Sequence, residues 1–148
     1  MEKKLCYGFV IIIVIIVILA GFFMSLSEPG VEVTDIKYRS VSLSTFTISF
    51  DVYLDIDNDN PIGAKLTYVE ADIYIDDQLF GTSYSEKEFE IGANEISQIQ
   101  VVLDVDNLPL SIINKNTVEV RVLGTAFLKV SFLDSEVPID KTEVVNIG

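Results

Sequence analysis

The sequence contains no histidine and no tryptophan, and its single cysteine is Cys6. Nucleophilic catalysis of the Ser-His-Asp or Cys-His type, and zinc sites that contain histidine, are therefore excluded. Cys6 lies at the start of a hydrophobic run, so the rest of the chain can form no internal disulfide. Carboxylates are plentiful, but no cleft-forming insertion favours a paired-carboxylate hydrolase. We therefore predict a protein that is not an enzyme and that binds no cofactor.

Positive charge is also scarce, because 10 basic residues stand against 23 acidic ones. Removing Glu2, Lys3 and Lys4 leaves 22 acidic and 8 basic residues, so the remainder has a net charge of −14. Such a charge repels nucleic acid and anionic lipid headgroups at long range. We expect a soluble domain that binds no nucleic acid, and an acidic face for a cationic partner or a metal stays open as an alternative.

One hydrophobic run, residues 5–26, contains no charged residue. As a helix, this run would span about 33 Å, enough for a hydrocarbon core of about 30 Å. Lys3 and Lys4 precede it, and the positive-inside rule then places residues 1–4 in the cytoplasm. We predict that residues 5–26 are a single-pass anchor in the bilayer of the cytoplasmic membrane. A linker, 27–30, and an extracytoplasmic domain, 31–148, would follow.

Two other routes of processing are alternatives for this run. A cleaved signal peptide would be a shorter apolar stretch followed by an A-x-A pattern, which is missing here. A pilin-like surface subunit would be cut near Gly8-Phe9. However, the basic residues are not adjacent to that position, and Ile13 stands where the fifth mature residue would be acidic. The uncleaved anchor is the preferred interpretation, and the two alternatives remain for experiment.

Beyond residue 30, apolar and polar residues alternate with the period of half-buried strands. We predict strands at 31–41, 45–57, 66–75, 78–83, 86–91, 99–105, 118–132 and 137–145. Gly124 should break or bulge its strand, and residues 108–115 should form a short helix. The side chains expected in the core include Phe46, Phe50, Leu54, Ile73, Val101, Leu103 and Val120. This pattern is typical of an all-β, antiparallel sandwich of the immunoglobulin or fibronectin III type, preceded here by one transmembrane helix.

Four segments, in order, carry a resemblance to a known family. They are the opening 31–36, the turn Asn58-Asp59-Asn60-Pro61-Ile62-Gly63, the hairpin 71–81 that ends at Gly81, and the strand 118–126 with its Gly124-Thr125-Ala126 step. Residues 31–140 thereby resemble the water-stress and hypersensitive-response (WHy) domain of the type-2 late embryogenesis abundant family. The resemblance implies a folded sandwich, association with desiccation and stress protection, and no catalytic residues. We expect the Asn60-Pro61 turn to serve geometry alone.

Three alternating carboxylates, Asp55, Asp57 and Asp59, are weak candidates for a calcium site. The EF-hand pattern fails, because the sixth position counted from Asp55 is Asn60 and the twelfth is Leu66. A solvated strand face followed by an Asx-type turn explains these residues without a metal. We therefore expect no specific metal site.

Two functions remain open for such a chain. The first is a non-enzymatic, membrane-tethered domain with a protective role under water stress or a structural role. The alternative is an interaction module that binds a protein, a surface polymer or a lipid tail between its sheets. An open apolar groove between the sheets would favour the alternative.

Overall fold

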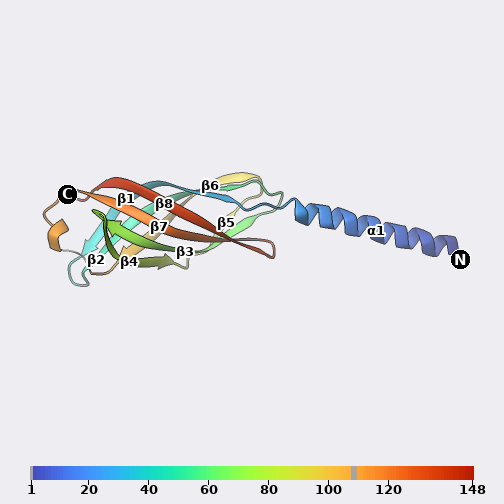
Figure 1. Cartoon of the computed structure of the whole chain (residues 1–148), viewed down its shortest axis with the longest axis horizontal. Coiled ribbons are helices and arrows are strands. Elements are labelled where there is room, and N and C mark those ends of the chain that lie inside the picture. Colours follow the sequence, from blue (N-terminus) through green and yellow to red (C-terminus); the bar gives the residue numbers. More distant parts are fainter. Residues whose placement is uncertain (1, 108–109) are drawn as a thin grey trace.

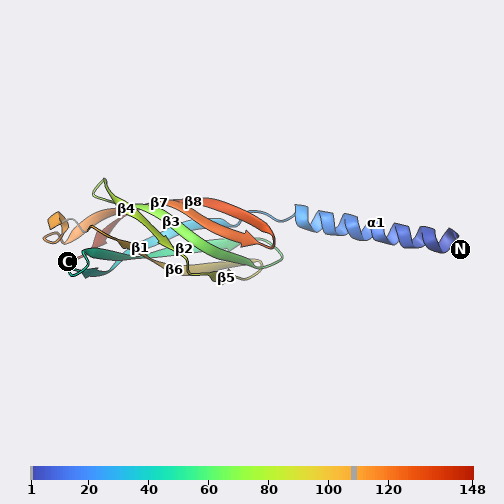
Figure 2. The same ribbon diagram turned by 90° about the horizontal axis from the view of Figure 1, so that it is seen from below.

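The computed structural model describes residues 2–107 and 110–148. It begins with one long helix, α1 (Glu2–Met24), which carries apolar side chains on all sides and has no buried residue. Among the described residues, α1 is the one helix long and apolar enough to cross a membrane, a test that a signal sequence also passes. Figures 1 and 2 show α1 leaving one end of a β-domain, with the C-terminus at the opposite end.

Within the described residues, eight strands form two antiparallel sheets that pack face to face as a β-sandwich (Figure 2). One sheet has the order β1-β2-β6, and the other has the order β4-β3-β7-β8, with β5 pairing with β3. The bounds are β1 Gly30–Ser42, β2 Thr47–Asn58, β3 Ala64–Ile75, β4 Gln78–Ser85, β5 Phe89–Ile91, β6 Glu95–Val105, β7 Thr117–Val130 and β8 Leu133–Asn146. The backbone N–H of Ile36 donates to Glu143 Oε2 at 2.9 Å, so β1 and β8 are joined across one open side of the sandwich.

The inward faces of both sheets form one hydrophobic core. The alternation predicted for the second strand is confirmed, because the inward residues from Ile48 to Ile56 are all buried. Six of the residues expected in the core are buried as predicted: Phe50, Leu54, Ile73, Val101, Leu103 and Val120. The prediction for Phe46 is wrong. Its side chain is 53% exposed, and its φ of 51° places it in the turn before β2, where strand alternation does not apply.

Gly124 neither breaks nor bulges its strand, contrary to the prediction. β7 runs without interruption from Thr117 to Val130, with Gly124 paired opposite Ala71 of β3. A Cβ at Gly124 would overlap the carbonyl oxygen of Glu70, so glycine is required here by the close approach of two backbones. The bulge lies in β3 instead, where Thr67 is inserted between Leu66 and Tyr68.

Some predicted segments are shorter in the structure. Of the helix expected over 108–115, residues 108–109 lie outside the described part of the chain, and one 3₁₀ turn, η1 (Leu110–Ile112), follows. Ile112 is buried in the core, and its carbonyl oxygen accepts a hydrogen bond from the Lys115 N–H at 3.0 Å shortly before β7 begins. The strand expected over 86–91 is reduced to β5, and β7 ends at Val130 because Ser131 has a left-handed φ of 56°.

Candidate functional site

The candidate site lies at the end of the sandwich to which α1 is attached, here called the helix-proximal end. It consists of residues 25–29 and the turns 59–63, 92–94 and 131–132. The β1–β2 turn, residues 43–46, lies at the opposite end, because β1 runs the length of the domain away from α1 (Figure 1). The helix-proximal end therefore determines how the helix and the sandwich are connected.

Two buried amides organise this end. Asn60 Oδ1 accepts a hydrogen bond from the backbone N–H of Ser27 at 2.7 Å, and Asn60 Nδ2 donates to the Ser27 carbonyl oxygen at 2.8 Å. Asn60 Nδ2 also lies 2.8 Å from Asn58 Oδ1. Asn58 Nδ2 in turn donates to the carbonyl oxygens of Ile62 and Gly92, each at 3.0 Å. The segment after α1, the 59–63 turn and the β5–β6 turn are thus held together by two side chains.

Burial explains why both positions are amides. Asn58 and Asn60 continue the inward-facing series of β2, and they are 0% and 1% exposed. A buried amide needs hydrogen-bond partners, and here the backbone of three segments supplies them. The sequence prediction gave this turn a geometric role alone and missed the contact with Ser27. The continuing alternation past Ile56 was the available signal, because it places two polar side chains on the buried face.

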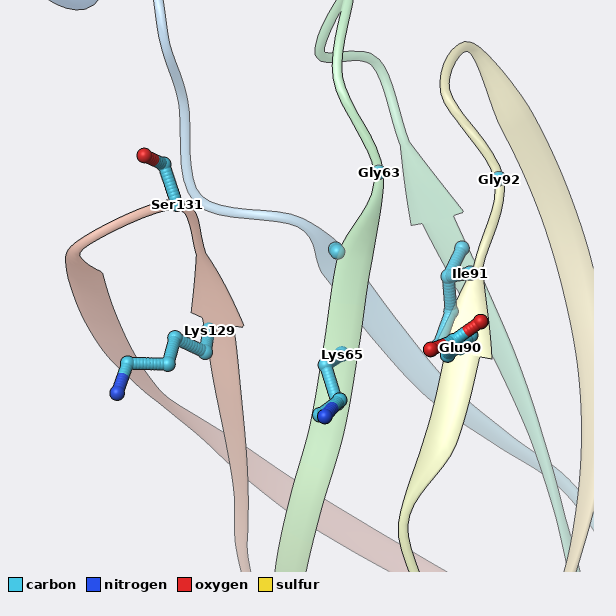
Figure 3. A pocket seen from close by; sticks show the side chains of 8 residues that line it. Gly63, Lys65, Glu90, Ile91, Gly92, Lys129 and Ser131 are labelled. Carbon is cyan, nitrogen blue, oxygen red and sulfur yellow. The ribbon is translucent and has the colours of Figure 1, made fainter.

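A shallow cleft of about 560 Å³ opens on the outer face of β5, β3 and β7 at the same end (Figure 3). Lys65 and Lys129, direct cross-strand partners, lie along it. Two ammonium groups side by side are unfavourable unless carboxylates balance them. Lys65 Nζ lies 3.3 Å from Glu88 Oε2, and Lys129 Nζ lies 3.9 Å from Asp134 Oδ1. The cleft is therefore a surface of mixed charge, suited to polar or zwitterionic groups.

In the part of the chain that the structure describes, inward side chains of both sheets pack into one buried cluster. An apolar recess of about 140 Å³ remains at the end remote from α1, and it is lined by Tyr38, Val41, Leu43, Ile48, Ile112, Ile113 and Ile147. Sites for small molecules usually measure about 300–1,000 Å³. The recess is smaller than this range, so the described residues give little support to a lipid tail held between the sheets.

The three candidate metal ligands lie along the end of β2 and in the turn that follows. Burial raises the pKa of Asp57, and the nearby charge of Asp59 raises it further. Across residues 2–107 and 110–148, the structure brings no three His, Cys, Asp or Glu side chains into an arrangement that could hold a metal ion. Burial of Asp57 and its closeness to Asp59 thus both disfavour its charged form.

The motif glycines have separate structural roles. Gly81 has a φ of 151° and lies at an irregularity of the β3–β4 pair, a backbone conformation that favours glycine. The β3–β4 hairpin has Asp76 and Asp77 as its two turn residues. Both have a left-handed φ, as a two-residue turn of type I′ requires. A Cβ at Gly63, the last residue of the Asn-Pro turn, would lie 3.2 Å from the Ile91 carbonyl oxygen. Of these residues, Gly63 lies beside the buried amides, whereas Gly81 and the Asp76-Asp77 turn lie toward the other end of β3, remote from α1.

The family model described as late embryogenesis abundant protein matches residues 53–143, more than half of the chain. The chain belongs to the late embryogenesis abundant type 2 family. Family membership fits a stress-related role, and members are typically non-enzymatic. The matched region begins in β2 and ends in β8, so it includes the Asn58–Asn60 turn.

Several solved structures share the fold of this chain. A protein from Archaeoglobus fulgidus superposes with a TM-score of 0.57 at 10% identity, over 84% of this chain and 98% of that chain. A protein from Arabidopsis thaliana gives 0.56 at 10% identity, over 83% and 84%. A structure described as a late embryogenesis abundant protein gives 0.52 at 12% identity, over 99% and 88%. At these identities the likeness shows the fold alone. No match was found when the sequence was compared with curated proteins.

Proposed function

We propose that this late embryogenesis abundant type 2 chain is a non-enzymatic, membrane-tethered domain of the WHy type. Its sandwich, which we assign to the immunoglobulin or fibronectin III class, would stand on the extracytoplasmic side of the cytoplasmic membrane. The proposed tether rests on one observation. The helix α1 is apolar on all sides and packs against no core, and its most apolar window has a mean hydropathy of 3.1. A helix of this kind needs an apolar surrounding, which a bilayer supplies.

The proposed domain organisation keeps residues 1–4 inside, 5–26 in the bilayer, 27–30 as a linker and 31–148 outside. Lys3 and Lys4 before the helix support this orientation through the positive-inside rule. The hydrogen bonds between Ser27 and Asn60 indicate that the linker is fixed to the domain rather than a free tether. The domain would therefore stand close to the membrane surface.

Cell fractionation tests the tether. The chain should remain in the membrane pellet after alkaline extraction, and protease added to intact spheroplasts should digest the β-domain. Sequencing the N-terminus of the mature protein distinguishes the alternatives. A soluble product that begins after Ala20 would indicate a signal peptide, and a product that begins at Phe9 would indicate a pilin-like subunit. Either result would contradict the anchor.

For the role of the domain, we propose protection or structural support under water stress. The family fits such a role, and a net charge of −14 over residues 5–148 opposes self-association. A tethered acidic domain could keep neighbouring surfaces apart and hydrated as water is lost. The test dries a labile reporter enzyme with this protein, or with an unrelated, equally acidic β-domain at the same mass concentration. If the reporter enzyme recovers the same activity in both samples, the protection comes from crowding and charge alone.

A second candidate, an interaction module for a protein or a surface polymer, is favoured by one outward-facing aromatic cluster. Tyr84 is 61% exposed and stacks on Tyr68 with ring centroids 6.0 Å apart, while Tyr68 lies 5.4 Å from the ring of Phe127. Exposed aromatic faces can bind partners by stacking. Crosslinking at the membrane surface should then trap a partner with the native chain and lose it with Tyr84→Ser. If the native chain and the Tyr84→Ser variant trap the same partner equally, this aromatic cluster is not the binding surface.

A further inference from the structure

A large apolar side chain stands at the tip of the β7–β8 hairpin. Phe132 is 64% exposed, and its ring centroid lies 5.1 Å from that of Phe23 in the last turn of α1. The neighbouring Leu133 is 37% exposed. Hairpin tips are normally polar, because their side chains face water. The exposure of two apolar residues beside the end of an apolar helix therefore requires an explanation.

The hairpin holds Phe132 in a fixed place. Val130 and Leu133 are paired directly, so Ser131 and Phe132 form a two-residue turn. Ser131 has a left-handed φ of 56°, as a tight hairpin turn requires. A turn this short leaves the tip little freedom to fold its side chain back onto the sandwich.

The position of Phe23 along α1 indicates how deep in the membrane the hairpin tip would lie. The apolar run ends at residue 26, and a helix of this length exceeds a hydrocarbon core of about 30 Å by only a few ångströms. Phe23, within the last turn, would therefore lie near the boundary between acyl chains and headgroups. Phe132 touches it from the domain side and would lie at a similar depth. Aromatic side chains, chiefly Trp and Tyr, are enriched at this boundary.

Two contacts support this alignment of α1 and the domain. Asn60 holds Ser27 by two hydrogen bonds, and Leu26 packs against the hydrophobic core. The chain between Phe23 and the sandwich is therefore short and fixed at its domain end. The helix-proximal turns would consequently face the bilayer surface.

We propose that the hairpin tip, Phe132 and Leu133, rests in the interface of the bilayer that α1 crosses, as a second lipid contact of this chain. The inference rests on the membrane tether proposed above. The neighbouring cleft presents Lys65, Lys129 and Glu90 (Figure 3), and the two lysines pair with Glu88 and Asp134 beside it. This mixture of charges, on an acidic domain, fits zwitterionic phospholipid headgroups better than an anionic surface.

The chain lacks tryptophan, so Phe132→Trp gives a protein with one indole, at the hairpin tip. The full chain would be reconstituted in phosphatidylcholine vesicles that contain lipids brominated at a shallow or a deep position of the acyl chain. Phe46→Trp is the matched control, because Phe46 is an exposed aromatic at the opposite end of the sandwich.

We expect shallow bromines to quench the fluorescence of the Phe132→Trp protein at least about twofold more than that of the Phe46→Trp protein. Deep bromines should quench the Phe132→Trp protein less than shallow ones do, as for an interfacial ring. Replacing half of the phosphatidylcholine by phosphatidylglycerol at low salt should weaken the quenching of the Phe132→Trp protein.

Flotation of the vesicles separates the possible failures. If the protein floats and the two variants are quenched equally, the hairpin contact is refuted while the anchor stands. If the chain does not float, both the tether and the hairpin contact are refuted. Stronger quenching with phosphatidylglycerol would overturn the preference for zwitterionic headgroups. Leu133→Trp provides an independent reporter at the same tip should Phe132→Trp not fold.

Discussion

Asn60 pairs with the backbone of Ser27 as a neighbouring strand would. Its Oδ1 accepts from the Ser27 N–H at 2.7 Å, and its Nδ2 donates to the Ser27 carbonyl oxygen at 2.8 Å. One buried side chain thereby fixes the residue three positions beyond the end of α1. The connection between helix and sandwich is consequently a defined joint.

Replacing Asn60 by Ala should loosen this joint. The change leaves the polar groups of Ser27 and Asn58 without their partner, a loss of about 1–3 kcal/mol in the free energy of unfolding. Limited proteolysis should also cut residues 25–30 faster. Urea unfolding followed by tyrosine fluorescence measures the stability. Asn146→Ala, at an exposed position, is the control and should change little. Equal stability of the two variants would show that the Ser27 contact contributes nothing.

Phe50→Ala should be among the most damaging core substitutions, because Phe50 is fully buried between the sheets. We expect a loss of about 3–5 kcal/mol in the fragment 27–148, measured by urea unfolding. Phe46→Ala makes the same chemical change at an exposed turn and should stay within about 0.5 kcal/mol of the native fragment. A loss under about 1 kcal/mol for Phe50→Ala would mean that the face of β2 is assigned wrongly.

Gly124→Ala should destabilise the sheet although it adds one methyl group. The new Cβ would overlap the backbone of β3 at Glu70 and Ala71, so β3 and β7 must move apart. Overpacking of this kind costs about 1–3 kcal/mol or more. In Gly30→Ala the new Cβ would lie 3.7 Å from Asp57 Cβ, an ordinary contact, which makes it the matched control. Thermal melts of both variants should differ clearly, and coinciding melting temperatures would contradict the close approach.

Asp76 should make stability depend on acid pH. Lys115 Nζ lies 2.6 Å from Asp76 Oδ2, and this hydrogen bond, with one from the Glu119 N–H, lowers the pKa of Asp76 below its usual value. A carboxyl with a lower pKa in the folded state stabilises the fold above its unfolded pKa, and this contribution is lost as the pH falls through the folded pKa. Asp76→Asn should therefore lower the melting temperature at neutral pH and approach the native value in strong acid. Glu136→Gln, an exposed carboxylate, is the control. If the melting temperatures of the native protein and Asp76→Asn differ by the same amount at every pH, the effect comes from packing instead.

Calcium should raise the melting temperature only slightly at millimolar concentration, by screening and weak binding near Asp57 and Asp59. Screening by calcium acts on the whole acidic domain, not on one carboxylate, although burial and the charge of Asp59 raise the pKa of Asp57. The Asp57→Asn variant should therefore show a similar, small response. Strong stabilisation by calcium that disappears in Asp57→Asn would make a metal part of the function. Magnesium at the same ionic strength separates specific binding from screening.

Local patterns were sufficient for much of the fold. Alternation predicted β2 with its buried face, because successive side chains of any strand point to opposite sides. The same rule failed at Phe46, because this residue has a left-handed φ and belongs to the turn. The alternation begins only with β2, at the next residue. At Gly124 the sequence showed that something unusual was required, but a bulge and a close backbone contact demand the same residue.

The sequence by itself determined the apolar helix, the strands and most of the buried face, because these depend on the order of neighbouring residues. Only the tertiary structure decided that Asn60 holds Ser27, 33 positions away, and that Phe132 touches Phe23. Both contacts join segments that lie far apart in the chain, and their geometry follows from how the two sheets pack. The junction between helix and sandwich is therefore a product of packing, which no local pattern in the sequence encodes.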